Sequence, residues 1–238
     1  QQAKLLASDG AEYERLGTSV ALSGDTALLG SPGDDTKALN CGSARVFTRS
    51  GTTWAQQTKL LPSDGSMNDN FGDAVALSGD TALVGVPYRD DKGNDSGSAY
   101  VFVRSGTTWT QQAKLLASDG SVSDHFGNSV ALSGDTALVG AFNDDDKGVD
   151  SGSAYVFVRS GTTWTQHAKL LASDGVTGEV FGNSVAVSGD TALVGEQTDS
   201  DVGFTAFGSA YVFARSGSIW TQQAKLIAND KADFDQFG

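Results

Sequence analysis

Apolar and polar residues alternate over short runs in this chain, and the same order of runs returns about every 55 residues. In the repeat that starts at Phe126, residues 128–132 alternate, with Val130 and Leu132 on one face and small side chains on the other. Alternation with period two predicts a half-buried strand. Residues 136–139 are nearly all apolar, which predicts a strand that is buried on both faces.

Two longer runs complete the repeat. Residues 153–159 place Tyr155 and Phe157 on one face, and residues 164–171 alternate as expected of an outer strand with one wet face. Glycine-containing tight turns at 133–135 and 160–163, and a long acidic loop at 141–152, separate the runs. We expect four antiparallel strands per repeat, with burial falling from the first two strands to the fourth.

The repeat is regular along the whole chain. Trp54, Trp109, Trp164 and Trp220 keep the step, and so do four Ser-Gly-Asp-Thr turns that begin at residues 23, 78, 133 and 188. A period of this length is typical of repeat architectures. Four-stranded antiparallel units of this kind predict an all-β fold made of β-propeller blades. A solenoid with 55-residue coils is the alternative, and the hairpin turns fit it poorly.

The repeats set the expected domain organisation. We expect one repeat domain over residues 1–238, with the first 15 residues as a surplus outer strand and residues 231–238 as the start of a further repeat. The predicted blades are residues 16–64, 71–119, 126–174 and 181–230. Three arrangements follow: a closed four-bladed ring, a portion of a larger propeller, or an assembly that neighbouring copies complete.

Composition narrows the classes of partner. The net charge is −13, which disfavours nucleic acid and anionic membranes. No apolar run approaches the roughly 20 residues that span a membrane, so we expect no membrane insertion. Cys41 is the one cysteine, which excludes a disulfide within the chain.

Short motifs within the repeat resemble a known family. Phe126-Gly127 is followed by Val139-Gly140-Ala141, and Phe71-Gly72 is followed by a run that ends at Pro87. These motifs resemble the FG-GAP repeat, the blade motif of the integrin α-subunit propeller and of many bacterial surface proteins. The resemblance implies an extracellular or cell-surface propeller that binds proteins or glycans.

The resemblance also bears on calcium. Calcium-binding members of the family carry an Asp-x-Asp-x-Asp-Gly loop between the first and second strands, whereas this chain has only Ser-Gly-Asp there. Three residues cannot supply the 6 to 8 oxygen ligands that calcium takes. The family's usual calcium site is therefore expected to be absent.

A different set of carboxylates could still hold a hard cation such as calcium. The acidic loops after the second strand carry aspartates at near-alternate positions, with Gly93 or Gly148 between them. The competing interpretation is a solvated loop closed by side-chain hydrogen bonds. The candidate ligands are Asp90, Asp91, Asp95, Asp144, Asp145, Asp146 and Asp150.

Other recurring residues favour structural roles. An acidic residue stands two positions before each Phe-Gly or Leu-Gly pair, as in Asp69 and Asp124, and we expect it to accept backbone N–H bonds. The turn aspartates and the tryptophans are expected to form turns and to pack the outer strands. His125 and His167 sit at unrelated repeat positions and are interpreted as surface substitutions.

The expected function is not enzymatic. The sequence contains no metalloprotease helix motif, nucleophile elbow or phosphate-binding glycine loop. We expect an extracellular recognition or adhesion module whose loops bind a protein or a glycan, with no required cofactor. Tyr88, Phe142 and Phe204 vary between repeats and are the expected partner surface. The alternative is a structural building block of a filament or surface assembly, in which further copies of the chain are the partners.

Overall fold

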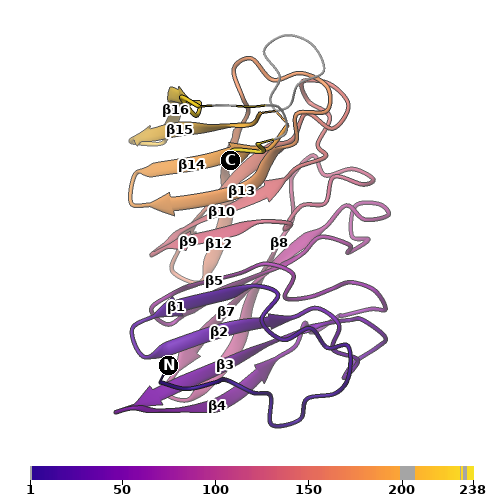
Figure 1. Ribbon diagram of the computed structural model, residues 1–238, viewed down its shortest axis with the longest axis vertical. Helices are drawn as coiled ribbons and strands as arrows, with labels where there is room; N and C mark the ends of the chain where they lie inside the picture. Colours follow the sequence, from indigo (N-terminus) through magenta and orange to yellow (C-terminus); the bar gives the residue numbers. More distant parts are fainter. Residues whose placement is uncertain (1, 199–206, 231, 233–234) are drawn as a thin grey trace.

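The computed structural model describes residues 2–198, 207–230, 232 and 235–238, and these residues contain strands and no helix. The strands form four sheets of four antiparallel strands each. Each sheet is built from one repeat, with its strands in chain order (Figure 1). The predicted all-β architecture of propeller blades is confirmed.

The strand bounds repeat from sheet to sheet. The first sheet contains β1 (Val20–Ser23), β2 (Thr26–Ser31), β3 (Ser43–Ser50) and β4 (Thr53–Leu60). The second contains β5 (Val75–Ser78), β6 (Thr81–Val86), β7 (Ser98–Ser105) and β8 (Thr108–Leu115). The third contains β9 (Val130–Ser133), β10 (Thr136–Ala141), β11 (Ser153–Ser160) and β12 (Thr163–Leu170). The fourth contains β13 (Phe181–Ser188), β14 (Thr191–Glu196), β15 (Ser209–Ser216) and β16 (Ile219–Leu226).

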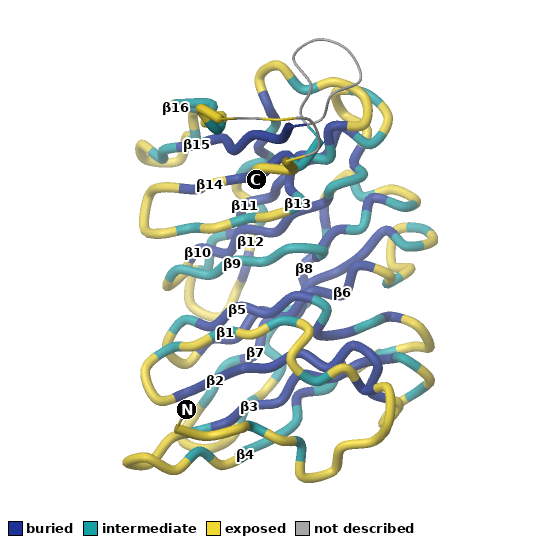
Figure 2. The backbone as a smooth tube through the Cα atoms, in the orientation of Figure 1, coloured by how far each residue is buried: buried dark blue, intermediate teal, exposed yellow. Residues whose placement is uncertain are grey.

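Burial follows the prediction for the second strand and departs from it for the first. The second strands of the first three sheets are buried throughout, and the third strands are buried over their first five residues (Figure 2). By contrast β1, β9 and β13 are largely half-buried or exposed, and only β5 is mostly buried. The prediction that the first strand is among the most buried was therefore wrong. The innermost strands line an open surface, and the central strands of each sheet form the core.

The four sheets stack in chain order as an open arc. Neighbouring sheets meet through their first strands, β1 with β5, β5 with β9 and β9 with β13. The first and fourth sheets lie at opposite ends of the molecule (Figure 1). A closed four-bladed ring is therefore not the arrangement of this structure. The larger propeller and the assembly completed by neighbouring copies remain predictions.

The Phe-Gly pair explains how one sheet joins the next. Phe126 is fully buried and packs edge-to-face on Tyr155, with ring centroids 5.4 Å apart. Gly127 lies against the preceding sheet, where a Cβ added to Gly85 would come within 1.9 Å of the Gly127 carbonyl oxygen. The same near-contact joins Gly30 with Gly72 and Gly140 with Gly182. Each joint is thus a contact between two backbones, which only glycine permits.

The segment before the first sheet covers part of its outer face. Leu5 packs against Ala27, Leu29 and Phe47. The Ser8 N–H donates to Gln56 Oε1 at 3.0 Å, as Ser63 does to Gln111 one repeat later. Residues 2–15 form no strand. The surplus outer strand expected there is therefore not formed.

Candidate functional site

The two ends of the blades differ in character. One end, which we call the loop end, gathers the long loops at 32–42, 87–97 and 142–152, and the segments at 61–74, 116–129 and 171–180 that lead from sheet to sheet. The other, the turn end, carries the short turns between the first and second strands and between the third and fourth. Figure 1 shows the loops on one side of the arc and the hairpins on the other. A site can therefore be sought at each end separately.

The turn end is uniform. In every sheet an arginine of the third strand donates from Nε to the aspartate of the Ser-Gly-Asp turn at 2.7 Å, as Arg104 does to Asp80. The same guanidinium lies over a tryptophan ring, as Arg104 does over Trp109 at 5.4 Å. Trp109 in turn donates to Gln57 of the neighbouring outer strand at 3.0 Å. The predicted turn and packing roles are confirmed, and these repeated contacts make the turn end a structural surface.

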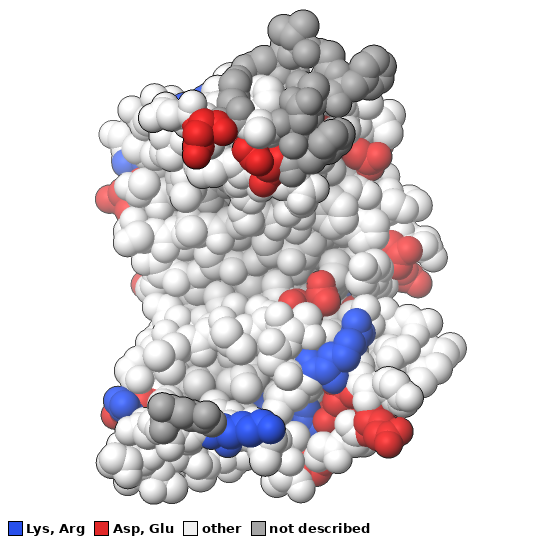
Figure 3. All heavy atoms as spheres, in the orientation of Figure 1, with Lys and Arg blue, Asp and Glu red and all other residues white. Residues whose placement is uncertain are grey.

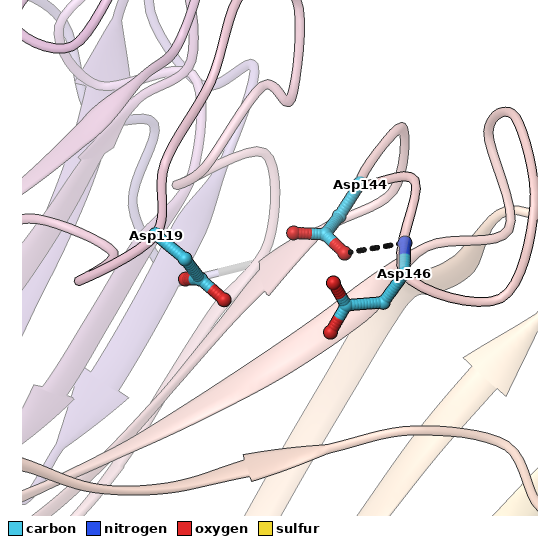
Figure 4. Close-up of side chains that lie close together, drawn as sticks. All are labelled: Asp119, Asp144 and Asp146. Carbon is cyan, nitrogen blue, oxygen red and sulfur yellow. Dashed lines mark hydrogen bonds between the residues drawn. The ribbon is translucent and has the colours of Figure 1, made fainter.

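The loop end contains a polar network in each sheet, and that of the third sheet holds three of its carboxylates within 4.8 Å of one another. These are Asp119, Asp144 and Asp146 (Figure 4). The Lys169 ammonium lies among them, at 2.8 Å from Asp119, 2.9 Å from Asp144 and 2.7 Å from Asp146. Burial alone would lower the pKa of Lys169, but its hydrogen bonds to these three carboxylates outweigh burial and raise it.

This geometry bears directly on the predicted cation ligands. Asp144 also accepts from Ser153 at 2.8 Å and from Tyr155 at 2.7 Å, so its oxygens are already engaged. Asp145 accepts the backbone N–H of Asp150 at 2.8 Å, which closes the loop. A calcium ion among Asp144, Asp146 and Asp119 would have to displace the Lys169 ammonium. Calcium binding here therefore stays a prediction.

The candidates of the second sheet are also paired. Asp91 accepts from Ser98 at 2.5 Å and forms an ion pair with Lys114. Asp90 accepts the backbone N–H of Asp95 at 2.9 Å, as Asp145 does with Asp150 one repeat later. The structure thus places the seven candidates in two groups, one in each loop. In each group one aspartate closes the loop by accepting the backbone N–H of another, Asp90 from Asp95 and Asp145 from Asp150.

The networks differ in how many cations they contain. Arg45 in the first sheet is fully buried and bonds to Glu14 at 2.8 Å and Asp34 at 3.0 Å, while Lys59 also pairs with Asp34. Burial opposes ionisation of Asp34, but hydrogen bonds from Thr36 and Lys59 lower its pKa to about 2. The second sheet likewise has Arg89 and Lys114.

In the third sheet the position of Arg89 is taken by Asp144. Among the described residues, Lys169 is then the one basic side chain bonded to this network. The nearby Asp124 is buried and accepts the Ser121 N–H at 2.6 Å. Burial, together with the charges of Asp144 and Asp145, raises the pKa of Asp124 to about 6.

The acidic residue before each Phe-Gly pair behaves as expected. Asp69 accepts the Ser66 N–H at 2.6 Å, and Glu179 accepts the Val176 N–H at 2.8 Å, each from three residues earlier. These carboxylates fix the segment that leads into the next sheet, which confirms the predicted structural role.

A shallow hollow of about 260 Å³ opens at the loop end between the first and second sheets. Four stretches of the first two repeats build it: the segment before the first sheet, the long loop of the first sheet, the segment between the two sheets, and the long loop of the second sheet. Its lining residues are Arg15, Asn40, Asn68, Asn70, Tyr88 and Asp95. All except Tyr88 have left-handed backbone conformations, with φ between 49° and 65°. Asparagine and aspartate tolerate this conformation, and arginine rarely adopts it.

Two of the expected partner residues lie together beside this hollow. The ring of His125 stacks on Phe142 at 5.2 Å and meets Tyr88 edge-on at 5.3 Å. Tyr88 and Phe142 come from the long loops of neighbouring sheets, so the stack bridges them. Phe204, the third expected partner residue, lies outside the described residues.

Two members of these clusters were not predicted from the sequence. His125 looked like an isolated surface substitution, because its ring partners lie in loops 37 residues before it and 17 residues after it. Arg45 replaces the tyrosine that the other third strands carry at this position, and this departure from the repeat was the available signal.

The fold and these joints define a β-propeller-type repeat protein. The FG-GAP repeat model matches residues 1–47, 54–102, 109–157 and 164–213. The chain therefore belongs to the FG-GAP repeat family. The search of curated proteins gave no match.

Among solved structures, the crystal structure of Saccharomyces cerevisiae Sqt1 is similar to this chain, with a TM-score of 0.52 and 10% sequence identity. The likeness covers 91% of this chain and 49% of Sqt1, so the chain spans about half the length of that protein. At this identity the likeness concerns the fold alone. Among the described residues, no helix is long and apolar enough to cross a membrane.

Proposed function

We propose that this chain is a non-enzymatic, extracellular recognition module that binds its partner at the loop end. The observation that carries the proposal is the contrast between the two ends. The residue before each Phe-Gly or Leu-Gly pair keeps a left-handed backbone but changes its side chain, from Arg15 to Asn70, His125 and Val180. Varied side chains on a constant scaffold are typical of binding surfaces.

Exposed apolar residues also support the loop end as the binding surface. Large apolar side chains of its loops and connecting segments are exposed to solvent, and nothing in the described chain covers them. They are Tyr13, Leu39, Met67, Tyr88, Val122, Val149 and Val176. A group of exposed apolar side chains on one surface indicates an interaction site. The acidic charge of the chain favours neutral or basic partners.

The proposal is tested by placing charge at each end in turn. The loop-end variant carries Met67→Lys and Val122→Lys, and the matched turn-end variant carries Thr107→Lys and Thr162→Lys. Both variants and the parent chain are applied to an array of immobilised oligosaccharides and extracellular proteins. We expect retention of the parent and of the turn-end variant, and loss for the loop-end variant. Equal retention of both variants, or no retention of the parent, would contradict the proposal.

A second candidate function is a structural one, assembly of copies end to end. Val20 and Leu22 on the face of the first sheet are each 67% exposed, whereas their counterparts Val75 and Leu77 are 6% and 9% exposed inside a joint. At the far face of the fourth sheet, Leu193 and Leu226 are 38% and 41% exposed. The counterparts of these two, Leu138 and Leu170, are 0% and 3% exposed.

The exposed apolar residues of the two end faces are therefore the counterparts of residues that are buried in the joint between neighbouring sheets. Residues 2–15 cover part of the first of these faces, and Phe237 and Gly238 contact the fourth sheet. Figure 3 shows few charged side chains over the middle of the face along which the first strands lie. Burial of apolar surface of this kind would stabilise contact between two copies. A second copy offers the complementary half at each end.

A further inference from the structure

The hollow between the first and second sheets is lined by side chains that both donate and accept hydrogen bonds. Three of its six lining side chains are asparagine amides, which carry two donors and one acceptor group each. Asn40 donates to Asn68 Oδ1 at 3.2 Å, which orients both amides. In the described part of the chain, the side chains of Asn70 and Arg15 make no hydrogen bond to another residue across the hollow.

The backbone around the hollow is held in place independently of any ligand. The Asn70 N–H donates to the Asn40 carbonyl at 3.0 Å, and the Asn68 N–H donates to the Leu39 carbonyl at 2.8 Å. Asp95 is fixed through its N–H by Asp90, and its own carbonyl accepts from His125 at 3.1 Å. The polar groups are therefore preorganised, which lowers the entropic cost of binding.

The composition of the hollow excludes several ligand classes. Asp95 is its one carboxylate, too few oxygen ligands for a divalent cation. Arg15 is balanced by Asp95, and the chain carries a net charge of −13, so a polyanion is disfavoured. The volume of about 260 Å³ lies slightly below the range of drug-sized ligand pockets, which suits one small ring.

Tyr88 supplies the apolar side of the hollow. Its ring is supported by the edge-on contact with His125 and remains 41% exposed. An aromatic face beside planar amides matches a molecule with one apolar face and a rim of hydroxyl groups. We propose that this hollow binds a neutral sugar residue, with Tyr88 against its C–H face and the asparagine amides and Arg15 on its hydroxyl groups. This inference rests on the proposed recognition function.

The next joint provides matched controls. One repeat further along, Ser123 stands in place of Asn68 with the same φ of 65°, and Asn143 stands in place of Tyr88. His125 stands in place of Asn70 there, with its ring stacked on Phe142. Substitutions in this joint change the same repeat positions without touching the hollow.

The test measures binding of methyl β-glycosides of glucose, galactose and N-acetylglucosamine to the whole chain. Saturation-transfer NMR detects binding, and competition gives relative affinities. We expect the parent chain to bind at least one glycoside with weak affinity, and Asn68→Gly and Tyr88→Ala each to weaken it by about tenfold, which corresponds to about 1.4 kcal/mol. Glycine at 68 removes the amide without straining the left-handed backbone. Ser123→Gly and Asn143→Ala should leave the affinity within about twofold, less than about 0.5 kcal/mol.

Two results would overturn the inference: no transfer to any glycoside from the parent chain, or equal weakening by the control variants. The array experiment separates this failure from that of the proposed function. If the loop-end variant still loses retention on immobilised proteins while no glycoside binds, the sugar is wrong and the recognition surface stands. If neither ligand class is retained, both proposals fall.

Discussion

At the scale of single residues, one difference between repeats decides whether a buried carboxylate has a cationic partner. Asp69 pairs with Arg89 at 3.1 Å, whereas Asp124 in the third sheet faces Asp144 at the equivalent position. The backbone bond to the carboxylate is the same in both sheets. Burial raises the pKa of both carboxyls, but the charge of Arg89 opposes this rise at Asp69, whereas the charges of Asp144 and Asp145 add to it at Asp124.

This difference predicts a pH effect on stability. Because burial and nearby carboxylates raise the pKa of Asp124 from 3.8 to about 6, the folded state binds this proton more tightly than the unfolded state. Its contribution to stability is fully present below about pH 4 and is lost as the pH rises through 6. We expect Asp124→Asn to raise the free energy of unfolding by about 1–3 kcal/mol at pH 7.5, and by nothing below about pH 4.

Denaturant titrations at several pH values provide the measurement. Asp119→Asn is the control with the opposite sign. Burial raises the pKa of Asp119, but its hydrogen bond and charge interaction with Lys169 outweigh burial and lower it. That contribution is present at neutral pH and lost in acid, so Asp119→Asn should destabilise the chain near pH 7 and have little effect near pH 3. Parallel pH profiles for the parent and Asp124→Asn would contradict the assignment.

A second prediction at the residue scale concerns how Lys169 affects the binding of calcium. Its ammonium satisfies the carboxylates that would otherwise attract a divalent ion. We expect Lys169→Met to lower the melting temperature without calcium, because the buried carboxylate of Asp144 loses its ammonium partner. We also expect millimolar calcium to raise the melting temperature of Lys169→Met by more than it raises that of the parent chain. Thermal melts with calcium and with chelator test this. A large calcium shift in the parent would instead support the calcium site predicted from the sequence.

At the scale of elements, the joint between sheets requires glycine where two backbones meet. A Cβ at Gly85 would lie 1.9 Å from the Gly127 carbonyl oxygen, a backbone atom that cannot rotate away. We expect Gly85→Ala to cost about 3 kcal/mol or more of unfolding free energy. Gly120→Ala is the control, since its added Cβ meets Ala117 at an ordinary 3.4 Å. A change within about 0.5 kcal/mol is expected there, and equal effects in chemical denaturation would argue against the backbone contact.

Much of the element-scale structure could be predicted from the sequence. Period-two alternation and the glycine turns placed the strands of the third sheet within a few residues, since a buried face fixes both strand type and register. The burial of β1, β9 and β13 was overestimated. Their apolar residues predict that these strands are buried. The sequence does not show that the arc leaves the surface along these strands open to solvent.

The candidate site was less accessible to prediction. The acidic loops were recognised, but the cations that neutralise them come from a different strand, 25 residues later in the case of Lys169 and Asp144. The hollow unites residues from Arg15 to Asp95, and its polar side chains have no periodic pattern. Such juxtapositions depend on how two sheets meet, which alternation within one strand does not encode.

At the scale of the whole molecule, the open arc leaves two complementary end faces. If copies join head to tail, the interface is heterologous and joins two different faces. Two variants, each with a different face blocked, can then form only one contact with each other, so a mixture of them is limited to pairs. We expect Leu22→Glu and Leu193→Glu each to be monomeric alone and to form a heterodimer when mixed, while the parent forms larger species. Leu39→Glu, an exposed change at the loop end, is the control. Sedimentation velocity distinguishes these states, and a parent chain that stays monomeric at high concentration would rule out the end-to-end candidate.

The glycine contacts between sheets have a consequence for how such a chain can diversify. Because backbone meets backbone at Gly30–Gly72, Gly85–Gly127 and Gly140–Gly182, the closest approach of neighbouring blades is the same at each of these joints. A blade could be duplicated, deleted or exchanged with another without changing the curvature of the arc. Residues at the loop end are then free to vary one blade at a time, and each new blade adds an independent recognition position at a fixed spacing.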